Sequence, residues 1–315
     1  EADATKVPQL QLILPELEDL NVPRILFLNK IDKADKRVRE TLKLLQPASR
    51  VPLLLRQIPI WNGDLIAGFV DLALERAFVY KEAAPSEVVD LNGENLDREK
   101  EARFTMLETL ADHDDELMEQ LLEDIQPPRD KVFDDLAKEL RDRIVCPVLL
   151  GCATRSNGVL RLLKALRHEA PGVAETVQRL GVKAGAEAIG LVLKTFHTAH
   201  GGKMSVTRVL SGQIGDGTTL SLPTGEAGRV SGVFKLMGQH FEKRGPAAAG
   251  DTVALGKLDT ARTGSTLSTG KQPHAALFDV QPTPPVLAIA VQARERKDDV
   301  KLGVAFTKLT EEDPS

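Results

Sequence analysis

The chain has 315 residues, 42% hydrophobic and 28% charged, which suits a protein of two or three globular domains. A formal net charge of −5 excludes a generally basic surface for nucleic acid, although a local basic face remains compatible with it. The sequence contains no apolar run long enough for a membrane span and does not start with a signal peptide, so we expect a cytoplasmic protein without a membrane partner.

The first third of the chain has the pattern of a parallel α/β sheet. Residues 9–20 predict a helix, residues 24–28 (RILFL) a short buried strand, and residues 36–46 a helix with one apolar face. Residues 51–89 then read as strands with Gly and Asn-Gly breaks. Strand, loop and amphipathic helix in this order are typical of a parallel sheet.

Charged helices and a second buried strand follow. Residues 97–144 predict two amphipathic helices separated by Pro127-Pro128, and residues 144–150 (IVCPVLL) predict the strand, which leads through a loop into another helix. Cys146 and Cys152 would lie roughly 20 Å apart in an extended chain, too far for a disulfide, which favours a reducing compartment.

The pattern changes near Gly185. Short strands alternate with Gly-rich turns, as in a small β-barrel. Residues 281–285 (QPTPP) predict a stiff linker, followed by a strand over 286–293 and a helix from Lys297 to about Leu309. The chain does not begin with Met and stops soon after this helix, so we expect an internal piece of a longer protein.

The strand at 24–28 ends in the sequence Asn29-Lys30-Ile31-Asp32. Guanine presents two adjacent donors, N1–H and the 2-amino group, and one fixed carboxylate such as Asp32 can accept both. Asn29 can contact the N7 side and brace the neighbouring loop, and the Lys30 stem can lie against the base. The alternative interpretation is a polar turn that caps the next helix.

A second loop follows the strand at 144–150. It begins Gly151-Cys152-Ala153, small residues that let backbone N–H groups approach a ligand closely, and the Ala153 N–H is placed to donate to guanine O6. An ordinary strand-to-helix turn would have the same composition. Neither loop alone decides the question.

Five segments, in order, resemble translational GTPases of the elongation factor G type. They are "VPRILFLNKID", "VPLLLRQIPIWNGDLIAGFVDL", "CPVLLGCATRSNGVLRLLKAL", "GGKMSVTRVLSGQIGDGTTL" with "AAAGDTVALGKLDTARTGSTLS", and "PPVLAIAVQARERKDDVKLGVAFTKLTEEDPS". The resemblance implies that Asn29, Lys30 and Asp32, with Gly151, Cys152 and Ala153, bind the guanine base. The family usually has Ser where Cys152 stands.

The resemblance also implies a multidomain fold. Residues 1–184 would be the C-terminal part of a P-loop GTPase-type α/β domain, with an inserted α+β subdomain at about 50–140. Residues 185–280 would be the β-barrel translation-factor domain, and residues 281–315 the truncated start of a ferredoxin-like α+β third domain.

The implied activity is GTP-dependent translocation in protein synthesis by a monomeric, cytoplasmic GTPase. Its partners would be GTP or GDP, Mg²⁺ and the ribosome, through rRNA and stalk proteins. No phosphate-loop motif, Gly-x-x-x-x-Gly-Lys-[Ser/Thr], occurs in the sequence. We therefore expect the magnesium ligands and catalytic residues in an N-terminal part outside this chain, and these 315 residues alone to be inactive.

Two alternatives stay open. One is a non-catalytic ribosome-docking paralogue, and the other is a different translational GTPase, such as a ribosome-protection or release factor. Weaker candidates are a metal pair at His197 and His200, which lacks nearby ligands, and the acidic stretch 111–124, which suits a solvated helix face. A local RNA-facing patch and scattered surface charges explain equally well the basic residues Lys203, Arg208, Arg229, Lys235, Lys243 and Arg244.

Overall fold

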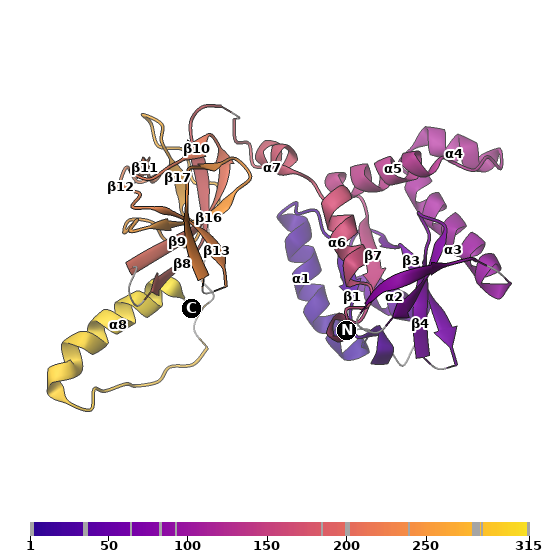
Figure 1. Ribbon diagram of the computed structural model, residues 1–315, viewed down its shortest axis with the longest axis horizontal. Coiled ribbons are helices and arrows are strands. Elements are labelled where there is room, and N and C mark those ends of the chain that lie inside the picture. The colour runs from indigo at the N-terminus through magenta and orange to yellow at the C-terminus, as the bar shows by residue number, and fades with distance from the viewer. Residues whose placement is uncertain are drawn as a thin grey trace. The chain divides into compact units, whose positions relative to one another are not determined.

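A computed structural model describes residues 3–33, 37–63, 65–81, 84–91, 93–183, 185–198, 202–238, 240–278, 284 and 286–313. The chain divides into two compact units, Glu1–Pro171 and Gly172–Ser315. Figure 1 shows helices and strands together in the first unit and mainly strands in the second. The protein thus has the α/β part and the all-β part that the sequence predicts, whereas the finer domain boundaries remain predictions.

A three-stranded parallel sheet forms the base of the first unit. Its strands are β1 (Leu26–Leu28), β7 (Cys146–Leu150) and β2 (Leu53–Leu55), in the order β1-β7-β2. All five residues of β7 are buried, as expected of a central parallel strand. Apolar side chains of α2 (Val38–Leu45) and of the three strands share one core.

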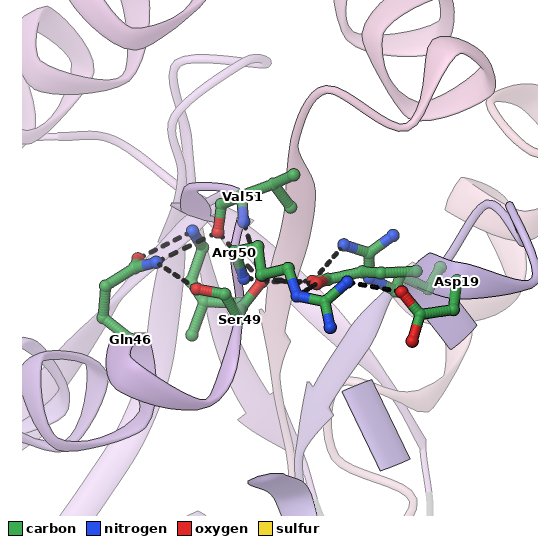
Figure 2. Close-up of polar contacts among 8 residues, drawn as sticks. Asp19, Gln46, Ser49, Arg50 and Val51 are labelled. Carbon is green, nitrogen blue, oxygen red and sulfur yellow. Dashed lines mark hydrogen bonds and ion pairs between the residues drawn. The ribbon is translucent and has the colours of Figure 1, made fainter. Parts of the chain in front are cut away.

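Helix α1 (Val7–Asp19) begins with a proline in its first turn and contains Pro15. A polar network joins the end of this helix to the loop before β2 (Figure 2). Glu18 accepts hydrogen bonds from Arg24, from the Ser49 hydroxyl and from the Arg50 N–H, and Arg50 pairs with Asp19. The loop into β2 is thereby fixed to α1.

An inserted subdomain separates β2 from β7. Its antiparallel sheet has the order β3-β4-β5-β6, formed by β3 (Gln57–Asn62), β4 (Leu65–Asp71), β5 (Arg76–Lys81) and β6 (Ala84–Val89). Apolar residues of this sheet pack against the helices that follow it in one core. The insertion therefore contains both a sheet and helices, as the resemblance implied.

Three helices lie among the described residues of the insertion, so the prediction of two over 97–144 was wrong. They are α3 (Glu94–Ala111), α4 (Asp115–Leu122) and α5 (Arg129–Asp142). The additional break lies at Asp114, whose side chain accepts a 2.9 Å hydrogen bond from the Leu117 N–H. Such an N-cap starts a new helix without any proline.

A buried charge network links the insertion to α6 (Val159–His168) and the residue that follows it. Arg56, fully buried, pairs with Glu169 at 2.5 Å, and Arg161 of α6 pairs with Asp71 at the end of β4. Arg161 also lies 3.6 Å from Glu169. These four buried charged side chains thus neutralise one another.

The second unit begins with a helix that the sequence did not predict, α7 (Val173–Arg179). Its eight-stranded sheet has the order β12-β11-β17-β8-β9-β16-β13-β14 and surrounds a core of fully buried aliphatic side chains. The strands of this sheet are β8 (Ile189–Thr198), β9 (Gly202–Ser211), β11 (Thr219–Ser221), β12 (Ala227–Arg229), β13 (Val233–Met237), β14 (His240–Arg244), β16 (Thr252–Gly256) and β17 (Thr266–Ser268). Two further strands, β10 (Gln213–Ile214) and β15 (Ala247–Ala248), pair with each other in a separate antiparallel sheet.

The strand predicted over 286–293 is absent, because this segment pairs with no strand among the described residues. Its apolar side chains are exposed instead, Val286 by 98% and Leu287 by 75%. Helix α8 (Asp299–Glu312) follows as predicted, and its last turn contacts β8. Within the described part of the chain, no helix has the length and apolar character needed to cross a membrane.

Candidate functional site

Two loops lie side by side at the carboxyl ends of β1 and β7. These strands are parallel neighbours, with Leu28 opposite Leu150, so the residues that follow them leave the sheet at the same edge. The Gly151 N–H donates to Leu28 O at 3.0 Å, and the Ile31 N–H donates to Gly151 O at 3.2 Å. The structure therefore brings together the two loops that the sequence selected.

Asn29 connects the two loops through one side-chain oxygen. Its Oδ1 accepts from the Lys30 N–H at 2.8 Å and from the Ala153 N–H at 2.9 Å. Lys30 has a φ of +59°, a left-handed conformation that a residue with a Cβ seldom adopts. The bond from its own N–H to Asn29 helps to hold that conformation, so Asn29 shapes both loops.

Asp32 lies in the short 3₁₀ helix Ile31–Lys33, with its side chain 16% exposed. Its Oδ2 lies 3.8 Å from Nε of Arg155, whose side chain is 66% exposed. Its Oδ1 is buried and has no hydrogen-bond partner in the part of the chain that the structure describes. A buried carboxylate oxygen without a donor is costly, and a guanine N1–H or 2-amino group would supply the donor. Asp32 is thus the candidate residue of this loop for a ligand that donates hydrogen bonds.

The second loop needs its glycines. A Cβ at Gly151 would collide with Asn157 O and lie 2.5 Å from Cζ of Phe27 on β1. Gly158 has a φ of +74°, and a Cβ there would collide with Leu150 O. The loop can pack this closely onto β1 and β7 only because both positions lack a side chain.

Cys152 is 1% exposed and has a structural place in the loop. Its backbone exchanges two hydrogen bonds with Asn157, at 2.9 and 3.1 Å, which closes the loop. Its Sγ lies 3.3 Å from Oγ1 of Thr154. The residue contributes mainly through its backbone, and a buried thiol in this position is no nucleophile for a substrate.

Sequence reasoning missed two residues of the site. Nε of Arg155 lies 3.8 Å from Oδ2 of Asp32, and Asn157 closes the loop through its backbone. The only signal for Arg155 was its position in the turn after Cys152. Conversely, the Ala153 N–H, expected to donate to a base, already donates to Asn29. A base at this position would share that N–H.

The weaker candidates have structural explanations. His197 lies 3.2 Å from Glu312 and 3.3 Å from Glu311, whereas His200 lies outside the described residues. Lys203 is 5% exposed and donates to Asp259 O at 2.8 Å, which removes it from any surface patch. Among the described residues, no three His, Cys, Asp or Glu side chains are grouped so as to hold a metal ion.

The parallel sheet, its two adjoining loops, the insertion and the barrel-like unit together define a class, the translational GTPase-like proteins. A family model described as "Elongation factor G domain 2" matches residues 187–270. The "Elongation factor G-like protein" of Synechocystis sp. (strain ATCC 27184 / PCC 6803 / Kazusa) is 36% identical over 317 residues, which cover 100% of this chain and 46% of that protein.

A solved structure agrees with these matches. The crystal structure of a protein from Thermus thermophilus superposes with a TM-score of 0.80 at 25% identity, over 94% of this chain and 44% of that one. Together the three matches support the assignment of this chain as part of an elongation factor G-type protein. It spans about half the length of the relatives it matches.

Proposed function

We propose that this chain is the guanine-reading part of a GTP-binding translation factor that resembles elongation factor G. One observation carries the proposal: Asp32 presents a buried carboxylate oxygen without a donor among the described residues, beside a loop that Asn29 ties to it. Those are the groups that a base with two adjacent donors and a neighbouring acceptor requires.

In this proposal each residue has a distinct task. Asp32 accepts from N1–H and the 2-amino group, Asn29 braces the loops and faces N7, and the exposed Lys30 stem covers one face of the base. The loop Gly151-Cys152-Ala153 approaches O6 through backbone N–H groups. Adenine would place an acceptor against the Asp32 carboxylate, and the unpaired charge would disfavour it strongly.

The phosphates need other parts. Phosphoryl transfer depends on a phosphate loop, Mg²⁺ and an oriented water, and Mg²⁺ supplies neutralisation of phosphate charge. The sequence of this chain has no phosphate-loop motif, so we propose that such parts are supplied from outside residues 1–315. The chain itself contributes base recognition. Through its barrel and its insertion it contacts rRNA and the stalk proteins of the ribosome. In this proposal it acts in the cytoplasm as a monomer.

A non-catalytic paralogue that binds the ribosome is the second candidate. One observation favours it: the relative from Synechocystis is described as elongation factor G-like. Another translational GTPase, such as a ribosome-protection or release factor, is a third candidate of the same class.

The test uses the complete product of the reading frame that encodes this chain. Titration with a fluorescent GDP derivative, in competition with GDP, IDP and ADP, measures base selectivity. We expect GDP to compete best, IDP less well because it lacks the 2-amino donor, and ADP least. Equal competition by GDP and ADP would contradict the proposed site. Ribosome-stimulated GTP hydrolysis then separates a GTPase from a docking paralogue.

A further inference from the structure

The end of β7, next to the guanine loop, is held from two sides. On one side, Gly151 forms backbone hydrogen bonds with Leu28 at the end of β1 and with Ile31 in the loop that follows. On the other side lies β2, whose last residue, Leu55, pairs with Val148. The Arg56 N–H still donates to Val148 O at 3.0 Å, and the main chain then continues into β3 of the inserted sheet.

A side chain replaces the missing strand at this point. The Leu150 N–H donates to Oε1 of Gln57 at 2.7 Å, and Gln57 is 0% exposed. Leu150 is also fully buried, so water cannot reach its N–H. Without Gln57 this N–H would have no hydrogen-bond partner. The amide thus extends the ladder between β2 and β7 by one hydrogen bond, directly before Gly151.

The hydrogen bond of Gln57 is made at a cost. Its Nε2 is buried and finds no partner among the described residues. An apolar residue of similar length would remove that unpaired donor, but it would leave the Leu150 N–H unpaired. Gln57 differs from a residue that only packs because its Oε1 accepts a hydrogen bond from β7, the strand that leads into the loop Gly151-Cys152-Ala153.

We propose that Gln57 is a positioning residue for guanine recognition. It fixes the end of β7 and thereby the position of the loop Gly151-Cys152-Ala153 relative to O6 of the base. This inference rests on the proposed function. It also identifies the first residue of the inserted sheet as part of the guanine site, although Gln57 itself touches no ligand.

Two variants and one control isolate the acceptor. Gln57→Met keeps the length of the side chain and loses the acceptor, whereas Gln57→Glu keeps an acceptor at the same reach. The control is Ile58→Val, the next residue of β3, which is 3% exposed and packs in the core of the insertion. All are made in the complete product of the reading frame.

The first measurement is hydrogen exchange at residues 150–153 and needs no nucleotide. We expect Gln57→Met to accelerate exchange there at least tenfold, with Gln57→Glu and Ile58→Val near wild type. Unchanged exchange in Gln57→Met would overturn the structural step of the proposal. This exchange measurement tests the structural step even if the protein does not bind guanine.

The second measurement compares GDP with 6-thio-GDP, which keeps both donors for Asp32 but replaces O6 with a weakly accepting sulfur. We expect Gln57→Met to weaken GDP about fivefold to tenfold, to change 6-thio-GDP less than twofold, and to be rescued by Gln57→Glu. Equal losses for both nucleotides would show a merely structural role and overturn the proposal. If Asp32→Asn also leaves GDP binding unchanged, the proposed function has failed, not the positioning step.

Discussion

The side-chain oxygen of Asn29 accepts a 2.9 Å hydrogen bond from the backbone N–H of Ala153, a residue 124 positions later in the chain. The same oxygen accepts from the Lys30 N–H, where the backbone is left-handed. One amide thus couples the two loops of the candidate site and supports a strained residue within one of them. The two hydrogen bonds to this oxygen thus fix the loops after β1 and β7 relative to each other.

The first prediction tests this coupling. Asn29→Ala removes the acceptor from two backbone N–H groups, so we expect GDP affinity to fall by about 2 kcal/mol or more, roughly thirtyfold. Competition titration measures the change. Lys33→Ala, at an exposed position of the 3₁₀ helix Ile31–Lys33, is the control and should bind GDP as wild type does. A tight-binding Asn29→Ala protein would remove Asn29 from the site.

The second prediction concerns base choice. Asp32→Asn replaces an acceptor of two donors with an amide, so GDP binding should weaken by about 3 kcal/mol or more. Xanthine has a carbonyl at C2, which accepts from that amide, and XDP should gain affinity in the same variant. Calorimetric titration with both nucleotides measures the inversion. If the GDP-to-XDP ratio stays at its wild-type value, Asp32 does not face the base.

The third prediction concerns the stability of the first unit. Glu169 pairs with Arg56, and both side chains are at most 3% exposed, so Glu169→Ala leaves Arg56 without its carboxylate. Breaking a buried pair in this way costs about 3–5 kcal/mol. The matched control is Glu101→Ala, which breaks the exposed pair with Arg39 and should cost less than about 1 kcal/mol. Urea unfolding measures both, and similar losses would contradict the network.

Much of the candidate site could be predicted because it depends on local pattern. The apolar strands at 24–28 and 144–150 end in polar or small residues, and parallel strands bring such ends to one edge. The structure places Asn29 and Asp32 beside Gly151–Ala153, as that argument requires. What these residues bind stays a prediction.

The contacts that sequence reasoning missed depend on tertiary structure. The Gln57 bond to Leu150 exists because β2 ends before β7 does, and strand lengths are poorly fixed by local pattern. The break at Asp114 was missed because an Asp among other acids gives no distinct cap signal. The strand expected over 286–293 has β-propensity, but a strand also needs a partner.

The fourth prediction is a pH dependence of stability. Burial, with Asp135 one helical turn away acting in the same direction, raises the pKa of Glu139 from 4.5 to about 8. Below pH 4.5 the carboxyl is protonated in both states. Between pH 4.5 and 8 the unfolded chain loses the proton and the folded chain keeps it, so this group lowers the free energy of unfolding as pH rises.

Glu139→Gln removes this titration, because an amide stays neutral at every pH. Thermal unfolding of wild type and variant across pH 4.5 to 8 should therefore show the variant becoming progressively more stable relative to wild type. Asp130→Asn, an exposed carboxyl in the first turn of the same helix, is the control and should run parallel to wild type. Parallel curves for Glu139→Gln as well would show that Glu139 is ionised in the folded state.

The last prediction concerns how protection from hydrogen exchange is distributed along the 315-residue chain. Amides in 186–278 should exchange slowest, because the eight-stranded sheet pairs them around side chains such as Leu220, Leu255 and Leu267, all 0% exposed. Residues 22–30 and 144–151 should be intermediate, since β7 is paired on both sides but β1 pairs only with β7 among the described strands. Residues 286–313 should exchange fastest, because 286–293 has no partner strand among the described residues and α8 contains no buried residue. Mass spectrometry of deuterium uptake resolves all of these ranges, and equal protection of 286–293 and the barrel would show that this segment is paired in solution.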